Sequence, residues 1–228
     1  MSPALAIVVT LVPAYLLGAM PWGLWIGLLR GVDVRKQGSG NLGATNVYRL
    51  LGPALGILVL ILDAAKGALA VTWGGQGPAG AAFPGGAAWA ALAAGIMAIV
   101  GHMLSVFARF RGGRGVATTI GVFLALAPKG MLIGLGAFVL AFALTRRVSV
   151  GSLALAVAFP IGVLLTGAPG PDRTRLFVLA LLAALLIIVR HIPNIRRLAR
   201  GQERALDLKG RGTARPAPTP PPTPRKGA

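Results

Sequence analysis

Apolar segments long enough to cross a lipid bilayer recur along most of this chain and limit its fold more than any other feature. A hydrocarbon core of about 30 Å requires roughly 20 consecutive apolar residues in a helix. Segments that approach or exceed this length lie at residues 4–29, 53–74, 87–108, 148–168 and 175–190, with two shorter ones at 115–127 and 130–145. Because 55% of the residues are hydrophobic and only 12% are charged, a soluble domain fits poorly. We therefore expect an all-α, polytopic membrane helix bundle with about seven transmembrane helices.

The distribution of basic residues predicts how these helices are oriented. With seven spans and the N terminus outside, only Lys129, Arg173 and Arg175 face outward and Lys66 lies within a span, whereas every other Lys and Arg is cytoplasmic. This asymmetry follows the positive-inside rule. Loss of either short segment alone would reverse all later loops, so we predict that both 115–127 and 130–145 cross the membrane. One broken helix made of both is the alternative.

The predicted domain organisation is simple. Residues 1–206 form a single transmembrane domain, which includes an uncharged external loop from Gly74 to Gly86. Residues 207–228 are basic and rich in proline, which is typical of a disordered cytoplasmic tail. We expect Pro13 and Pro21 to kink the first segment.

Composition also excludes several kinds of chemistry. The chain has no cysteine, so disulfides and cysteine nucleophiles are absent. Five scattered acidic residues do not supply the carboxylate cluster that a magnesium site needs, so we expect no metal. The net charge of +18 would also suit nucleic acid. Since the basic residues adjoin apolar spans, the lipid bilayer with its anionic leaflet is the expected partner, and nucleic acid is not.

The loop between the first two spans has the composition of an anion site. It reads Gly38-Ser39-Gly40-Asn41-Leu42-Gly43-Ala44-Thr45-Asn46 and is followed by Arg49. Small residues allow backbone amides to turn toward an anion, and a guanidinium group suits phosphate. A flexible loop that only reverses the chain is the alternative. The density of polar donors favours anion binding.

A second glycine-rich turn, Arg111-Gly112-Gly113-Arg114-Gly115, leads into the segment 115–127. Such a turn at a helix N terminus, with two arginines, is suited to phosphate. The spacing of a Walker loop is absent. A basic loop that only sets the membrane topology is the alternative.

A third polar cluster follows the last span. It contains Arg190, His191 and Asn194, and Glu203 lies further along the chain. His191 could act as a general base or a phosphate ligand. A solvated or capping histidine at the membrane interface is the alternative. The neighbouring Asn194 and Arg190 moderately favour the functional role.

Charged residues within the spans have a different expected role. Asp63 and Lys66 have the i, i+3 spacing that places them on one helix face, and His102 lies late in the third span. Buried charges are costly in a bilayer and usually face the interior of a bundle. We expect a structural brace between helices, with a direct role as the alternative.

These motifs together resemble the bacterial acyl-phosphate glycerol-3-phosphate acyltransferase family, PlsY. The resemblance rests on four stretches that occur in the family's order, SGNLGATNVYRLLG, DAAKG, GHMLSVFARFRGGRGVAT and RHIPNIRRLARGQE. It implies an enzyme that moves a fatty acyl group from acyl phosphate to the 1-hydroxyl of glycerol 3-phosphate, giving lysophosphatidic acid and phosphate in phospholipid synthesis. It also implies a bacterial inner-membrane protein with a cytoplasmic active site and without a cofactor.

The resemblance assigns roles to particular residues. The implied catalytic residues are Ser39, Arg49, Arg114, His191 and Asn194. The expected substrate-binding residues are Gly40, Asn41, Thr45, Asn46, Arg111, Gly112, Gly113, Gly115, Ser149 and Ser152, although only one of the two serines need contact substrate. The expected structural residues are Asp63, Lys66, His102 and Glu203.

The chain departs from the family at a few positions, and some mechanistic alternatives stay open. Arg111 and Arg114 stand where the family usually has lysine, which replaces a point charge with a planar fork. The proton of the attacking hydroxyl could pass to His191 or to a substrate phosphate oxygen, and a covalent Ser39 intermediate is a third route. An anion or phosphate-ester transporter is the alternative function, because polar groups within spans would suit one.

Overall fold

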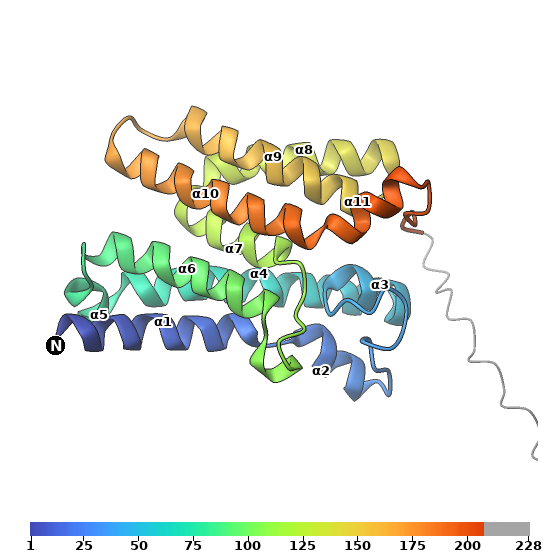
Figure 1. Cartoon of the computed structure of the whole chain (residues 1–228), viewed down its shortest axis with the longest axis horizontal. Helices are drawn as coiled ribbons and strands as arrows, with labels where there is room; N and C mark the ends of the chain where they lie inside the picture. Colours follow the sequence, from blue (N-terminus) through green and yellow to red (C-terminus); the bar gives the residue numbers. More distant parts are fainter. Residues whose placement is uncertain (208–228) are drawn as a thin grey trace, which may run out of the picture.

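The computed structural model describes residues 1–207, in which every regular element is helical (Figure 1). The elements are α1 (Pro3–Ala19), α2 (Trp22–Leu29), α3 (Ala44–Leu51), α4 (Pro53–Gly75), α5 (Gly77–Ala82), α6 (Ala87–Met103), the 3-10 helix η1 (Val106–Ala108), α7 (Val116–Leu126), α8 (Pro128–Thr145), α9 (Val148–Thr166), α10 (Pro171–Arg190) and α11 (Ile192–Ala199). The predicted all-α class is confirmed for this part of the chain. The predicted tail falls on residues 208–228, outside the described residues, except for Asp207.

Five segments are long and apolar enough to cross a membrane. They are Pro3–Leu29, Pro53–Gly75, Ala87–Ala108, Pro128–Thr145 and Val148–Thr166. A sixth is obtained if α10 and α11, which are bent by 55°, are counted as one span. The predicted segment 115–127 corresponds to α7, whose 11 residues rise only about 16 Å. By length alone α7 does not cross a core of about 30 Å, so α8 is the one candidate span among the two short segments expected in this region.

The N-terminal segment is broken at Pro21, as its sequence suggested. α1 ends at Ala19 and α2 begins at Trp22, whereas Pro13 lies inside α1 without ending it. Proline lacks an amide hydrogen and cannot continue the helical hydrogen bonding. The carbonyl of Met20 that the break leaves free accepts a hydrogen bond of 2.8 Å from Lys66 Nζ. A charged side chain of α4 therefore stabilises the gap in the first span.

Small residues allow the helices to approach closely. α1 packs on α6, α4 packs on both α6 and α7, and α8 and α9 form a pair that extends to α10. A Cβ at Gly18 would clash with the backbone of Ala98, and one at Gly121 would clash with the backbone of Ala64. Close backbone contact of this kind is the usual means of helix association in membranes. The expected external loop 74–86 is not fully irregular, because α5 lies within it.

The polar motifs meet at one end of this bundle. α3, α11 and the chain between α6 and α7 lie toward the end opposite α5 and the N terminus (Figure 1). The helices thus bring together segments that are far apart in the sequence, and the site forms where they end.

Candidate active site

A cavity of about 200 Å³ lies where the three polar motifs meet. Its polar lining comes from the first loop and α3, from the glycine turn before α7, from α4 and α6, and from the start of α9 and the end of α10. These polar residues are Ser39, Asn41, Thr45, Asn46, Arg49, Asp63, His102, Arg114, Ser152 and His191. An apolar part is lined by Leu60, Val116, Ile120, Leu135, Phe138 and Val148.

Asn46 organises the first loop. Its Oδ1 accepts a hydrogen bond of 2.9 Å from the amide of Ser39, and its Nδ2 donates to the carbonyls of Val34 and Gln37. Gly38, which has a φ of 63°, lies against the Asn46 side chain, where a Cβ would not fit. Asn46 is therefore occupied in fixing the loop around Ser39, although it also borders the cavity.

Arg49 projects from α3 toward the C-terminal segment. Its Nη2 donates to the carbonyl of Arg204 over 3.2 Å. Burial lowers the pKa of the Arg49 guanidinium, and the nearby Glu203 carboxylate partly offsets this effect. Arg49 is thus a half-buried cation on the cavity wall with further donors that no protein group occupies within residues 1–207.

The glycine turn is held from two sides. The amide of Gly113 donates to the carbonyl of His102 over 3.0 Å, and that of Gly112 donates to Met103. On the other side, the guanidinium of Arg190 donates to the carbonyls of Gly112 and Gly113 at distances of 2.9 to 3.1 Å. The sequence pattern had assigned no such role to Arg190, and its position next to His191 was the only signal.

Arg114 leaves this turn and lines the cavity. Burial lowers the pKa of Arg114 to about 10, and Glu203 opposes that shift while other arginines add to it. The next residue, Gly115, has a φ of 80° and leads directly into α7. Arg111 is different, because its side chain is exposed and does not line the cavity. The structure thus places only one of the two arginines of this motif at the site.

His191 is the polar residue of the third motif that reaches the cavity. Its Nδ1 lies 2.8 Å from the carbonyl oxygen of Ile187. Because a carbonyl only accepts, Nδ1 carries the hydrogen, and Nε2 of the neutral ring is left with a free lone pair. His191 is buried, so this nitrogen is directed into a protected environment.

Asn194 and Glu203 form a separate cluster next to the cavity. Asn194 donates from Nδ2 to Glu203 Oε1, and Arg197 Nε lies 2.7 Å from Glu203 Oε2. Ser149 is buried, whereas Ser152 lines the cavity and donates to the carbonyl of Val148. Neither Asn194, an expected catalytic residue, nor Ser149, an expected substrate-binding residue, lines the cavity.

The charged residues within the spans form one buried group. Lys66 Nζ lies 2.9 Å from Asp63 Oδ1, and His102 Nδ1 lies 3.5 Å from the same oxygen. All three side chains are buried, as expected for a brace between α4 and α6. Asp63 and His102 also line the cavity, so the brace forms part of its wall. Within residues 1–207 no cluster of His, Cys, Asp and Glu is arranged to hold a metal ion.

Comparison with known proteins identifies the family. A sequence profile described as "Glycerol-3-phosphate acyltransferase" matches residues 8–201, most of the chain. The chain belongs to this glycerol-3-phosphate acyltransferase family. The resemblance expected from the motifs is thereby confirmed.

Individual glycerol-3-phosphate acyltransferases show how far the similarity extends. The protein of Trichlorobacter lovleyi is 45% identical over 190 residues, which cover 83% of this chain and 92% of the relative. That of Anaeromyxobacter dehalogenans strain 2CP-C is 45% identical over 206 residues, 90% and 99% of the two chains.

Two solved structures have the same fold. They are crystal structures of PlsY, described as an integral membrane glycerol 3-phosphate acyltransferase. Its glycerol 3-phosphate form has a TM-score of 0.78 and 35% identity and covers 89% of this chain and 96% of that one. The form named for lysophosphatidic acid has a TM-score of 0.77 and 34% identity, with coverage of 90% and 97%. The chain therefore has the fold of an integral membrane acyltransferase along most of its length.

Proposed function

We propose that this glycerol-3-phosphate acyltransferase takes its acyl group from an acyl phosphate and transfers it to the 1-hydroxyl of glycerol 3-phosphate within the cavity. The products are lysophosphatidic acid and phosphate, at the start of phospholipid synthesis. The observation that carries the proposal is that one cavity is lined by Arg49, Arg114, His191 and Ser39 at its polar side and by apolar residues at the other. Two phosphorylated substrates and one fatty acyl chain require such a combination.

Two arginines offset the repulsion between the substrates. Arg114 and the turn Gly112–Gly115 would hold the phosphate of glycerol 3-phosphate at the N terminus of α7. Arg49, with Ser39 and Thr45 beside it, would bind the phosphate of the donor. Holding both substrates in contact replaces a bimolecular encounter between two anions with a reaction inside one complex.

The chemistry needs few protein groups because phosphate is a good leaving group. The hydroxyl oxygen of glycerol 3-phosphate attacks the acyl carbonyl carbon, the bond from that carbon to the phosphate oxygen breaks, and phosphate departs. The hydroxyl proton passes to His191 Nε2 or to a phosphate oxygen of the donor. A covalent Ser39 intermediate has little support, since Ser39 Oγ has no hydrogen-bonded base among residues 1–207.

The apolar part of the cavity would accept the acyl chain. Leu60 on α4, Ile120 on α7 and Leu135 and Phe138 on α8 line it. Leu60 lines the cavity and is also exposed at the surface of the bundle, so an acyl chain would enter from the bilayer between these helices.

The remaining sequence expectations belong to this proposal. Residues 1–206 form one transmembrane acyltransferase domain with an external N terminus and a cytoplasmic active site. The seven membrane crossings of this topology require the short α7 to cross together with the chain that flanks it. The basic, proline-rich segment 207–228 would be cytoplasmic. The enzyme resides in the bacterial inner membrane and uses neither metal nor cofactor. Support comes from the basic residues, which gather at the loops next to the cavity, and from the bacterial origin of the relatives.

The decisive experiment uses purified protein in detergent or lipid cubic phase. Palmitoyl phosphate and glycerol 3-phosphate are supplied without metal or CoA, and phosphate and lysophosphatidic acid are quantified. Both products should appear in equal amounts, and both should be lost in Arg49→Ala and strongly reduced in Ser39→Ala. Product formation from palmitoyl-CoA but not from palmitoyl phosphate would refute the donor assignment. Family membership already argues against the transporter alternative.

A further inference from the structure

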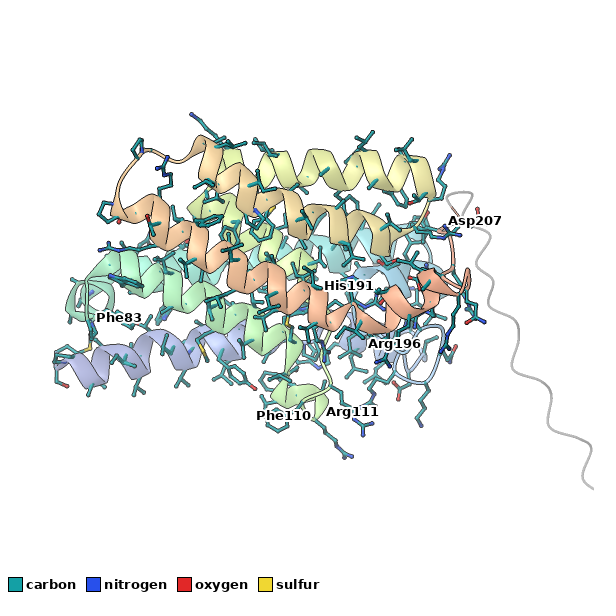
Figure 2. The ribbon with its side chains drawn as sticks, turned by 45° about the horizontal axis from the view of Figure 1, so that its top comes forward. Phe83, Phe110, Arg111, His191, Arg196 and Asp207 are labelled. Carbon is teal, nitrogen blue, oxygen red and sulfur yellow. The ribbon has the colours of Figure 1, made fainter. Side chains whose placement is uncertain are left out.

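The chain between α6 and the glycine turn leaves the bundle. After α6 it descends sideways, next to α2, and returns to α7 (Figure 1). Figure 2 shows Phe110 and Arg111 of this segment pointing away from the other helices. We name residues Leu104–Arg111 the side loop. Only Gly112 and Gly113 separate it from Arg114.

The side loop exposes apolar and basic side chains together. Phe110 is 61% exposed, Phe107 is 49% exposed and Leu104 is 46% exposed. Arg109 and Arg111 are exposed between and beside them, and residues 104–115 contain no acidic side chain. Aromatic rings that alternate with arginine in this way suit the boundary between acyl chains and phosphates of a bilayer.

The backbone of the side loop is strained in a way that directs these side chains outward. Arg109 and Phe110 have φ values of 55° and 60°, and two successive left-handed residues are uncommon for side chains of this size. The conformation is fixed at its base, because the amide of Phe110 donates to the carbonyl of Ser105 over 2.7 Å. Ser105 Oγ in turn donates to Ala19, and Tyr15 donates to Leu104, so the loop is anchored to α1.

The neighbours of the side loop expose apolar side chains as well. The Phe107 ring lies 5.9 Å from that of Trp25 on α2, and Leu28 and Leu29 of the same helix are 51% and 84% exposed. The exposed apolar surface of the transmembrane helices therefore continues onto the loop. A bilayer covers such a surface without any further partner.

We propose that the side loop is a binding site for anionic phospholipids. Phe107 and Phe110 lie among the upper acyl-chain carbons, and Arg109 and Arg111 bind the lipid phosphates. Arg111 does not line the catalytic cavity, and this assignment gives it a ligand outside the cavity. It does not depend on which acyl donor the enzyme uses.

Fluorescence can test the proposal directly because the chain has no cysteine. In the Phe110→Cys variant, a polarity-sensitive fluorescent label is attached to the introduced thiol, and the full-length protein is reconstituted into vesicles. Arg200→Cys, at an exposed position after α11, provides the matched control. Phosphatidylcholine or phosphatidylglycerol with a spin label high on the acyl chain serves as the quencher. At position 110 we expect quenching several-fold stronger than at position 200, and stronger with phosphatidylglycerol than with phosphatidylcholine. Adding Arg109→Gln and Arg111→Gln should abolish the preference for phosphatidylglycerol.

A second measurement keeps the test informative if Phe110→Cys does not fold. Wild-type protein and the Arg109→Gln/Arg111→Gln variant are compared for the amount of phosphatidylglycerol that co-purifies from equal mixtures of the two lipids. We expect at least a twofold enrichment in the wild type that the variant lacks. Equal quenching at positions 110 and 200, or equal lipid retention by the two proteins, would overturn the proposal.

Discussion

Replacement of Gly113 by alanine tests the cavity wall most directly. A Cβ at Gly113 would lie 2.9 Å from His102 Cε1 and 3.1 Å from Cδ2, and closer still to Nε2. The imidazole is buried and paired with Asp63, so it cannot swing away freely. The turn must therefore shift by roughly 1 Å, and a misplacement of that size costs about 100-fold in rate, or about 2.7 kcal/mol.

The assay is kcat/KM with glycerol 3-phosphate as the varied substrate. We expect Gly113→Ala to lower it about 100-fold, mainly through KM, because the shift displaces the proposed phosphate site. Gly136→Ala on α8 is the matched control, since nothing lies within 4 Å of a Cβ there. A folded Gly113→Ala protein with activity within twofold of wild type would refute the reasoning.

A double-mutant cycle locates the cause of the loss. In a His102→Ala background, Gly113→Ala should cost much less, because the clashing ring is gone. Gly112→Ala should lose as much in that background as in the wild type, since its Cβ would lie 2.7 Å from backbone atoms of Met103. Equal behaviour of the two glycines would show that the His102 ring is not the constraint.

Three further predictions concern charge and proton transfer. Burial lowers the pKa of Arg114 to about 10, and a lysine, whose ordinary pKa is near 10.4, would lose its proton at lower pH in the same place. In Arg114→Lys, the alkaline limb of the pH–activity profile should therefore move at least one pH unit toward neutral. An unchanged limb would contradict a charged role for this residue. Lys66→Ala removes the ammonium group from the buried Asp63 carboxylate and leaves only His102, 3.5 Å away, beside it; this change should destabilise the protein by about 3–5 kcal/mol in thermal unfolding, with partial recovery when Asp63→Asn is added. His191→Gln should lower kcat by about 10²-fold or more if Nε2 accepts the proton, and retention of most turnover would assign that proton to the donor phosphate.

The elements that the sequence predicted well are those marked by a long apolar run within the segment itself. Hydropathy marked the segments that became α4, α6, α8 and α9, because a long apolar run has few other structures available in lipid. It also marked 115–127 as a short helix, which is α7, but an apolar composition does not reveal whether 11 residues cross the membrane. The break at Pro21 was visible in the sequence, but the closing of that break by Lys66 depends on a contact between distant segments.

The sequence motifs predicted which residues lie near the site, but not which of their side chains point into the cavity. Ser39, Arg49, Arg114 and His191 do meet at one cavity, although three motifs that are far apart in the sequence supply them. Asn194 belongs to the same motif as His191, yet it faces the Glu203 cluster instead. Residue spacing indicates which residues are near each other but not where each side chain points after a bend such as that of 55° at the start of α11.

The short chain after α11 has a consequence for the synthesis of the enzyme. The carbonyl of Glu203 accepts a hydrogen bond from Arg147, that of Arg204 accepts one from Arg49, and the amide of Leu206 donates to Arg146. These contacts join residues that follow all the helices in the chain to segments that are inserted much earlier. A ribosome-bound chain that has placed all its membrane helices would still lack the hydrogen bond from Arg49 until Arg204 emerges. The cavity wall at Arg49 is therefore completed only after the membrane helices are in place, when the chain beyond α11 folds back onto them.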